Sequence, residues 1–276
     1  MNNAPLVSVI ITTKNEERNI GNCLKSVKEQ SYPASALEAI VMDNHSTDDT
    51  VKIAKNFTEK IYLKGPERAA QRNYGAQKAK GKYILYLDAD MILSKEVVTE
   101  CVAKCEDEDY IALYIPENII GDGFWIKVRD FERSFYNASC VDAVRFIKKD
   151  KFLKVKGFDE EKLASGPEDW DFDRRIKQLG NTSIIKYPLY HNEGAFAINN
   201  YLSKKGYYSK ALDGYVKKWG KDDPIIKKQL GACYRLFRVF IENGKWKRLM
   251  RHPLLTAGMY FLRFRVALTY LKSQNT

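Results

Sequence analysis

The sequence predicts an α/β fold in which a mostly parallel sheet is flanked by helices. Strand-like and helix-like patterns alternate through the first hundred or so residues, and this alternation is typical of a parallel sheet wound with right-handed crossovers. Acidic residues follow the strand-like runs, as in Asp88-Ala89-Asp90, at the position where open α/β sheets bind their ligands. With 276 residues, 45% of them hydrophobic, the chain can form one large core, or a catalytic domain with a smaller appendage.

Periodicity and end signals predict the first two strand–helix units. Residues 7–12 form an apolar run that predicts a strand, and apolar side chains spaced between residues 20 and 27 predict a helix that ends before Pro33. Residues 39–43 predict the second strand. Ser46-x-x-Asp49 resembles a capping box, so a short helix is expected to open there.

The third unit ends in the acidic pair. Alanines at 69, 76 and 79 predict a helix that leads past Gly81 into a buried strand at 83–87. Asp88 and Asp90 follow at the carboxyl end of this strand. Carboxylates so placed can clamp a hard divalent cation, which in turn neutralises phosphate oxygens. The alternative is a solvated turn that carries two acids.

The middle third is less regular. Pro167 suits the first position of a helix, and apolar residues follow it at helical spacing, so Glu168 and Asp169 are expected in the first turn of that helix. Two further strands and one turn are predicted at 110–115, 143–147 and 157–160.

A change of composition near residue 195 predicts a boundary, after which the chain is helical, basic and aromatic. The segments 234–241 and 259–266 intersperse arginines among apolar and aromatic side chains. This pattern suits helices in a membrane interface, with rings at the acyl boundary and guanidinium groups near lipid phosphates. Arg263 and Arg265 lie on nearly opposite faces of such a helix. The alternative is a helical pair that packs on the catalytic domain or on a dimer partner.

Charge and cysteine usage narrow the class of protein. The net charge of +11 implies attraction to polyanions, which include nucleic acid, anionic lipid surfaces and phosphorylated substrates. Five cysteines without paired CxxC spacing indicate neither a disulfide framework nor a zinc site, and Cys101 and Cys105 are expected in the core. The chain shows no signal-peptide pattern and no apolar run near the roughly 20 residues that span a bilayer. A cytoplasmic location is therefore expected.

Six segments together carry a family resemblance. They are Val9 to Glu17, Val41 to Asp48, Arg72-Asn73-Tyr74-Gly75, Gly81 to Asp90, Gly157-Phe158-Asp159-Glu160 and Glu168-Asp169. In this order they resemble glycosyltransferase family 2, the inverting, nucleotide-sugar-dependent enzymes of the GT-A fold. The resemblance covers roughly residues 6 to 195. It implies a GT-A domain at 1–195, with a nucleotide-binding half at about 1–115 and an acceptor half at about 116–195, followed by the helical region 196–276.

The resemblance implies which residues contact the nucleotide-sugar, namely Thr12, Thr13, Glu16, Asp43, Arg72, Asp88 and Asp90. Asp43 would accept a hydrogen bond from a base N–H, because a uracil-like ring offers a donor between two carbonyls; a plain turn residue before a helix is the alternative. Arg72 would reach the base or a phosphate, and a solvated helix arginine is the alternative. Asp88 would bind the ribose or the sugar.

A divalent cation, Mn²⁺ or Mg²⁺, is the implied cofactor. Asp90 would be its ligand, with diphosphate oxygens and water in the remaining positions. His191 matches a position where some GT-A enzymes present a further metal ligand. The alternative for His191 is a satisfied surface histidine after a strand.

Asp169 matches the catalytic base of the family. That base takes the proton of the acceptor hydroxyl as the hydroxyl oxygen attacks the anomeric carbon opposite the leaving diphosphate. A place in the first turn of a helix favours the ionised carboxylate, and plain helix capping is the alternative. Glu168 and Trp170 flank the base and are expected at the acceptor or directly behind the catalytic groups.

Two departures from the family pattern qualify the resemblance. Lys14 stands where an aromatic residue is common, and Asn44-His45 replaces the usual acid–glycine pair, so contacts to the base are expected to differ. The Gln-x-x-Arg-Trp signature of the processive polysaccharide synthases is absent after Asp169. Transfer of a single sugar is therefore favoured over polymerisation.

The predicted function is inverting, metal-dependent transfer of one sugar from a nucleotide-diphospho-sugar, with a UDP-sugar favoured, to an acceptor hydroxyl. An anionic membrane surface is an expected partner, so the acceptor would be a lipid-linked or cell-surface glycan precursor, such as a glycan on polyprenyl phosphate. The enzyme would then be peripheral on the cytoplasmic face of the membrane.

Two other functions fit the sequence less well. A haloacid-dehalogenase-like phosphatase needs Thr or Val where the chain has Ile92. A non-catalytic nucleotide or polyanion binding module would explain the charge, but acids at three strand ends would repel a phosphate backbone, and nucleic acid is not an expected partner.

Overall fold

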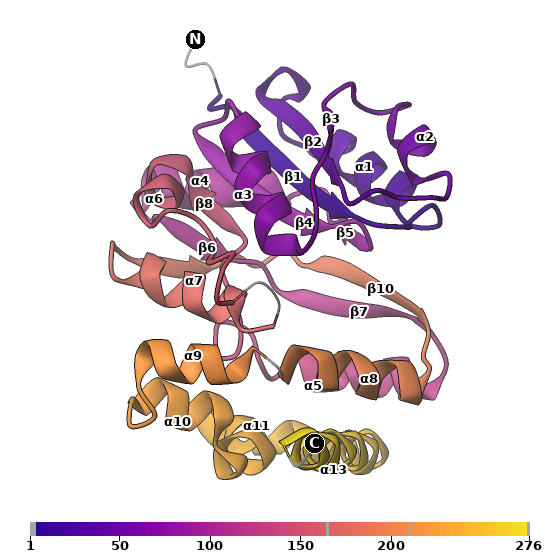
Figure 1. Cartoon of the computed structure of the whole chain (residues 1–276), viewed down its shortest axis with the longest axis vertical. Coiled ribbons are helices and arrows are strands. Elements are labelled where there is room, and N and C mark those ends of the chain that lie inside the picture. Colours follow the sequence, from indigo (N-terminus) through magenta and orange to yellow (C-terminus); the bar gives the residue numbers. More distant parts are fainter. Residues whose placement is uncertain (1–3, 164–165, 210, 275–276) are drawn as a thin grey trace.

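The computed structural model describes residues 4–163, 166–209 and 211–274. It confirms an α/β fold with a helical C-terminal region. Figure 1 shows a central sheet flanked by helices, with the C-terminal helices gathered at the end of the molecule opposite the N-terminus. The two strands that run toward those helices belong to a second, smaller sheet.

Seven strands form the main sheet. They are β1 (Val7–Thr13), β2 (Leu37–Asp43), β3 (Ile61–Leu63), β4 (Tyr83–Asp88), β6 (Ala112–Tyr114), β8 (Phe146–Lys148) and β9 (Thr182–Ile184). Their order is β3-β2-β1-β4-β8-β6-β9. The first four are mutually parallel, whereas β8 is antiparallel to both of its neighbours. The sheet is therefore mostly parallel, as predicted.

A three-stranded sheet, in the order β5-β10-β7, joins distant parts of the chain. Its strands are β5 (Met91–Leu93), β7 (Glu117–Asp122) and β10 (Leu189–Ala195). In its register His191 pairs with Met91 across the antiparallel side. The segment directly after Asp90 is thereby fixed beside His191, which lies a hundred residues further along the chain.

Helices cover both faces of the main sheet. They are α1 (Ile20–Lys28), α2 (Thr50–Ala54), α3 (Arg68–Lys78), α4 (Val97–Asp107), α6 (Lys149–Lys154) and α7 (Glu168–Lys177), with a 3₁₀ turn η1 (Ala34–Ala36). Helix α5 (Phe124–Arg133) instead packs on β7 of the small sheet. Side chains alternate along a strand, so Val9 and Ile11 pack with α1 and α4, whereas Ile10 packs with α3 and α7. Cys101 and Cys105 are buried in the first of these cores, which confirms that prediction.

The capping box predicted at Ser46 is wrong. Helix α2 begins at Thr50, and its N-cap residue makes no side-chain cap. Both the backbone N–H and the hydroxyl of Ser46 donate to the carboxylate of Asp43. Because Asp43 engages these groups, Ser46 belongs to the turn after β2, and Asp48 accepts from the Thr50 N–H at 3.0 Å instead.

The region after β10 is helical. It contains α8 (Ile198–Ser209), α9 (Leu212–Trp219), α10 (Pro224–Leu230), a π-helical turn η2 (Tyr234–Arg238), α11 (Val239–Ile241), a 3₁₀ turn η3 (Glu242–Gly244), α12 (Trp246–Arg251) and α13 (Pro253–Gln274). Within the described residues, no helix is both long enough and apolar enough to cross a membrane.

One side of α13 packs on the rest of the protein. Met259 and Leu262 are buried in a cluster with Val128 of α5 and with Phe240, so packing on the catalytic region accounts for part of the apolar pattern in the sequence. Figure 1 shows α13 beneath α5 and α8. Arg263 points into this packed side, whereas Arg265 is exposed, as their spacing predicts.

Candidate active site

The carboxyl ends of three neighbouring parallel strands meet at one edge of the main sheet. Thr13 of β1 is in register with Asp43 of β2, and Thr12 is in register with Asp88 of β4. The sheet thus gathers polar residues that lie up to 76 positions apart in the chain. This is the edge at which the sequence predicted a nucleotide-sugar site.

Asp88 is held by a hydroxyl and two guanidinium groups. It accepts hydrogen bonds from Thr12 Oγ1 at 2.9 Å and from Arg72 Nη2 at 3.1 Å, and its other oxygen lies 3.4 Å from Arg68 Nη1. Burial raises the pKa of Asp88, but Arg72, Arg68 and Arg145 outweigh burial and hold this pKa well below its usual range. Asp88 is therefore ionised and fixed in position.

Arg72 connects the strand edge to the predicted base. Its Nη1 donates to Asp169 Oδ1 at 2.7 Å while its Nη2 contacts Asp88. The guanidinium lies over the rings of Tyr86 and Phe158, at 4.6 and 5.2 Å from their centroids, and the side chain is only 1% exposed. In this arrangement Arg72 positions two carboxylates, and its contact with a base or phosphate stays a prediction.

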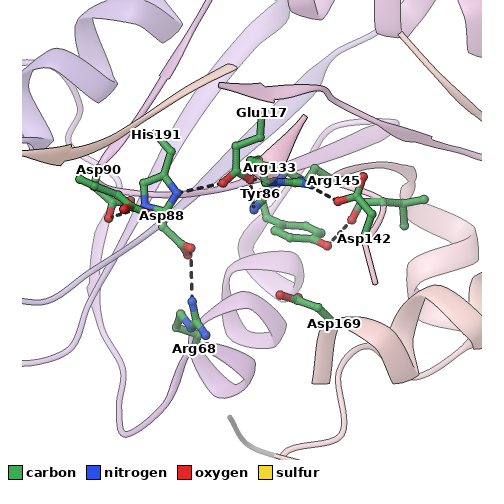
Figure 2. A network of polar contacts seen from close by, with 12 residues as sticks. Arg68, Tyr86, Asp88, Asp90, Glu117, Arg133, Asp142, Arg145, Asp169 and His191 are labelled. Atoms are coloured by element: carbon green, nitrogen blue, oxygen red, sulfur yellow. Dashed lines mark hydrogen bonds and ion pairs between the residues drawn. The ribbon is translucent and has the colours of Figure 1, made fainter. Parts of the chain in front are cut away.

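Asp90 and His191, the two residues expected to bind a metal, lie next to each other. Figure 2 shows the His191 ring between Asp90 and Glu117: Nε2 is 3.1 Å from Asp90 Oδ2, and Nδ1 is 3.0 Å from Glu117 Oε1. Burial lowers the pKa of His191, but the two carboxylates raise it more, to about 10. The other oxygen of Asp90, Oδ1, is buried without a hydrogen-bond partner in the structure.

This pair fits a shared divalent cation. A carboxylate oxygen and an imidazole nitrogen are ligands that Mn²⁺ accepts, and the buried Asp90 Oδ1 is a further ligand atom, to which no described residue donates a hydrogen bond. In the part of the chain that the structure describes, no cluster of three or more His, Cys, Asp or Glu residues could hold a metal by itself. A cation here would therefore take its remaining ligands from substrate and water.

Behind His191 lies an ion-pair network that the sequence did not indicate. Glu117 Oε2 lies 3.4 Å from Arg133 Nη2 and 3.3 Å from Arg145 Nη2, and Arg133 also pairs with Asp142 at 2.7 Å (Figure 2). Burial raises the pKa of Glu117, but Arg133 and His191 have the larger, opposite effect and hold this pKa well below its ordinary value. Glu117 is thus a fixed anion that orients the imidazole of His191.

Asp169 and Glu168 are both in the first turn of α7 but face different surroundings. The Asp169 side chain is 26% exposed and lines a cavity, whereas Glu168 is fully buried, 3.4 Å from Arg68. Burial and the neighbouring Asp169 raise the pKa of Glu168 to about 7. Of the two acids, Asp169 is the one that a substrate can reach. Trp170 lines the same cavity.

The other residues expected to contact the nucleotide lie at the ends of β1 and β2 and in the segment after β1. Asp43 is buried at the end of β2, with its carboxylate bonded to Ser46. The Thr13 hydroxyl is buried without a partner in the structure. Glu16 accepts from Asn19 at 2.7 Å, and burial, aided by Asp90, raises its pKa. Their contacts with a nucleotide stay predictions.

A cavity of about 610 Å³ lies between the end of β4, β10 and the first turn of α7. Asp88, His191 and Asp169 all line it, and it continues between α5, α8, η2 and α13. The sequence therefore located the acids of the site, and the fold adds a chamber large enough for a sugar and part of an acceptor.

Sequence reasoning missed several charged residues of the site. Arg68 precedes Arg72 by four residues on the predicted helix, so the i, i+4 spacing could have placed both on one face. Glu117, Arg133 and Arg145 had no such signal, because they lie in the irregular middle third and meet only through tertiary packing.

Comparisons with known proteins identify the family. Residues 8–163, more than half of the chain, match the family model described as Glycosyl transferase family 2. TarS of Staphylococcus aureus, a poly(ribitol-phosphate) beta-N-acetylglucosaminyltransferase, is 31% identical over 117 residues, which are 39% of this chain and 20% of TarS. A GalNAc(5)-diNAcBac-PP-undecaprenol beta-1,3-glucosyltransferase of Campylobacter jejuni is 26% identical over 260 residues, 91% of this chain and 75% of that protein.

Solved structures share the fold. The mannosyltransferase PcManGT of Pyrobaculum calidifontis, in complex with GDP-Man and Mn²⁺, has a TM-score of 0.63 at 20% identity and covers 98% of this chain and 88% of its own. TarS residues 1–349 of S. aureus, in complex with UDP-GlcNAc, give a TM-score of 0.55 at 18% identity, covering 98% and 90%. The GT-A fold implied by the sequence is thereby confirmed. The chain belongs to glycosyltransferase family 2.

Proposed function

We propose that this protein is an inverting glycosyltransferase that uses a divalent cation and transfers one sugar from a nucleotide-diphospho-sugar to an acceptor hydroxyl. One observation carries the proposal: a single cavity is lined on one side by Asp88 and His191 and on another by Asp169. Donor-binding groups and a reachable carboxylate thus face the same space, as in-line displacement requires.

Asp169 is the proposed general base. The acceptor oxygen forms a bond to the anomeric carbon while the bond from that carbon to the diphosphate oxygen breaks, and the nucleoside diphosphate leaves with the electron pair. The hydroxyl proton passes to Asp169. Arg72 occupies Oδ1 of this carboxylate, and among the described residues nothing donates to Oδ2. Oδ2 is therefore the atom that would receive the proton.

Asp90 and His191 would hold the cation. When bound, the ion neutralises charge on the diphosphate oxygens of the donor and of the departing nucleotide. Asp88, held by Arg72 and Arg68, would orient the sugar nucleotide beside it. Mn²⁺ is supported as a candidate by PcManGT, whose structure contains Mn²⁺ and GDP-Man.

A UDP-sugar is the proposed donor, and a phosphate-linked glycan or polyol is the proposed acceptor class. TarS, whose structure contains UDP-GlcNAc, supports the nucleotide. The relatives' names support the acceptor class: one acts on poly(ribitol-phosphate) and the other on an undecaprenol diphosphate glycan. Asp43 is the proposed acceptor of the uracil N–H, and Ser46 would have to release part of its hydrogen bonding to that carboxylate.

The proposed place of action is the cytoplasmic face of a membrane, with α12 and α13 as the contact. Leu254, Phe261, Phe264 and Leu268 are exposed on α13, and their spacing of seven, three and four residues aligns them on one side of a helix. Arg265 is exposed on the same side. Apolar and aromatic groups with interspersed cations suit an anionic lipid surface.

Replacing Asp169 with Asn tests the proposed chemistry, because it removes the base and keeps the shape of the side chain. Mn²⁺-dependent binding of UDP, followed by thermal shift, should remain within about twofold of the parent, since ligand binding to the native state raises its stability. Sugar transfer should fall by at least about 10²-fold, the lower end of what general base catalysis contributes. Transfer at the parental rate would show that Asp169 is not the base.

A further inference from the structure

We propose that Arg129, Lys205, Arg235 and Arg263 form an anion-binding subsite that holds a phosphate group of the acceptor. We call these four residues the cationic floor. The inference rests on the proposed function and deepens it, because it names the acceptor class as phosphorylated. Nothing in the family resemblance assigns a role to these residues.

The cationic floor belongs to the chamber that contains the candidate base. All four residues line the same 610 Å³ cavity as Asp169. They come from four different elements: Arg129 from α5, Lys205 from α8, Arg235 from η2 and Arg263 from α13. The helices that follow the catalytic region are therefore what completes this end of the chamber.

Two of the four cations have carboxylate partners. Arg129 pairs with Glu132 at 2.9 Å and with Glu193 at 3.0 Å, and Arg263 pairs with the same Glu132 at 3.2 Å. Arg263 also donates to the backbone carbonyl of Arg235 at 2.7 Å. The Arg263 side chain is only 7% exposed, and its Nε is buried without a hydrogen-bond partner in the structure.

The other two cations lack a carboxylate. Among the described residues, Lys205 makes no ion pair and only lies over the ring of Tyr201, 5.4 Å from its centroid. The Arg235 guanidinium likewise has no acidic partner in the described part of the chain and lies 6.0 Å from the Trp170 ring. Four cations thus share two carboxylates, which leaves an excess of two positive charges inside a chamber.

This excess of positive charge raises the free energy of the folded protein unless an anion binds there. Charged groups removed from water are normally paired, because desolvation destabilises the charged form. The titration of the cluster agrees with its geometry: burial and Arg129 lower the pKa of Lys205 to about 7, and burial and Arg263 lower the pKa of Arg235. An anion bound among these side chains would remove both penalties.

A phosphate group matches the floor best. Its oxygens accept the forked donors of arginine and carry more charge than a carboxylate. Apolar side chains also line this end of the cavity, among them Leu230, Leu236 and Val266, and these suit a lipid chain attached to the phosphate. Polar side chains such as Tyr201 line it as well, and these suit a polyol. A phosphate group is common to the lipid-linked and the polyol acceptor.

The test measures phosphate binding with the donor site already filled. The full chain is saturated with UDP and Mn²⁺, and farnesyl phosphate or glycerol 3-phosphate is then titrated by calorimetry. Lys205→Met and Arg235→Met should each weaken binding at least tenfold. Lys217→Met, an equal charge change on the exposed surface of α9, should leave binding unchanged. Tighter binding of farnesyl phosphate indicates a lipid-linked acceptor, and tighter binding of glycerol 3-phosphate indicates a polyol phosphate.

Two results would overturn the subsite: parental affinity in both Lys205→Met and Arg235→Met, or no binding of either probe to the parent protein. Loss of folding is checked separately, since Lys205→Met removes a half-buried cation that makes no ion pair with the described residues and should not lower the melting temperature. The UDP titration in the same series reports on the donor site alone. Failure of UDP to bind would contradict the proposed function, whereas normal UDP binding without phosphate binding would contradict only the subsite.

Discussion

Arg72 donates to Asp169 Oδ1 at 2.7 Å and thereby ties the first turn of α7 to the end of β4. The two residues are 97 positions apart in the sequence. Since the guanidinium is nearly buried between two aromatic rings, it has little freedom to move. The candidate base is therefore positioned by the nucleotide-binding half of the fold.

Replacing Arg72 should affect catalysis more than donor binding. Arg72→Met leaves Asp88 and Asp169 without their shared partner, so we expect kcat to fall at least about tenfold, the change that corresponds to 1.4 kcal/mol. The free energy of unfolding should fall by about 3 kcal/mol, because one partner of a buried ion pair is removed. Urea unfolding and steady-state transfer rates measure the two effects. Arg72→Lys keeps the charge but cannot donate to both carboxylates with a planar guanidinium group. Compared with Arg72→Met, it should regain part of the stability but not the transfer rate.

Removal of the proposed metal ligands should uncouple UDP binding from the cation. In the parent protein, Mn²⁺ should increase the thermal shift produced by UDP, and EDTA should abolish this increase. Asp90→Ala and His191→Ala should each behave as the parent does in EDTA. Glu117→Gln, which changes the group that orients His191 and also removes the carboxylate that pairs with Arg133 and Arg145, should weaken the effect of Mn²⁺ by about 10-fold. An undiminished Mn²⁺ effect in Asp90→Ala would contradict the metal assignment.

The stability contributed by Glu132 should disappear in acid. This carboxylate is buried between Arg129 and Arg263, and although burial raises its pKa, the two guanidinium groups lower it to about 2. The folded-state pKa is thus below the unfolded value of about 4.3, so the stabilisation is complete above pH 5 and is lost as the pH falls toward 2. Denaturant titrations should therefore find Glu132→Gln destabilising by about 3 kcal/mol at pH 7 and nearly neutral at pH 2.5. A pH-independent difference would show that only packing is affected.

Phosphate binding at the cationic floor should weaken as the pH rises above 7. The free protein holds the pKa of Lys205 near 7, and a bound anion favours the ammonium form, so binding takes up a proton above that pH. The affinity for farnesyl phosphate should fall gradually near pH 7, where about half of the Lys205 side chains are neutral in the free protein, and by up to tenfold per pH unit toward pH 9. The charged and titratable groups that face Lys205 are Arg129, Glu132, Tyr201, Arg235 and Arg263.

None of these neighbours titrates between pH 7 and 9, and a phosphate monoester is fully ionised there because its second pKa is about 6. The pH dependence can therefore be assigned to Lys205. Calorimetry on Lys205→Met should show weak binding that is independent of pH over this range. A parallel decline in the parent and in Lys205→Met would assign the effect to another group.

The sequence predicted those parts of the site that depend on local pattern. Apolar runs followed by acids placed Asp43, Asp88 and Asp90 at strand ends, because a parallel sheet brings such ends to one edge whatever the loops do. The helix start at Pro167 placed Asp169 in a first turn to within one residue. These features follow from a few adjacent side chains and from the geometry of regular elements.

Other parts of the site depend on packing between distant segments. Glu117 reaches His191 only because β7 pairs with β10, and the three-residue strands β3, β5 and β9 are too short to show a period. The cationic floor likewise draws single residues from four elements. Its charges are visible in the sequence, but their convergence is set by how α13 packs against α5 and α8, which no periodicity encodes.

The exposed side of α13 gives the final prediction, on membrane binding. Leu254 is 77% exposed and Phe264 is 48% exposed, so charged replacements there should leave the fold intact. Leu254→Glu combined with Phe264→Glu should reduce flotation with vesicles that contain anionic lipid by at least tenfold, because it removes apolar contact and adds charge of the wrong sign. Leu153→Glu, at an exposed leucine on α6, is the matched control and should float like the parent. If the double variant also floats like the parent, then the exposed side of α13 does not bind the membrane, and the acceptor reaches the chamber without help from that surface.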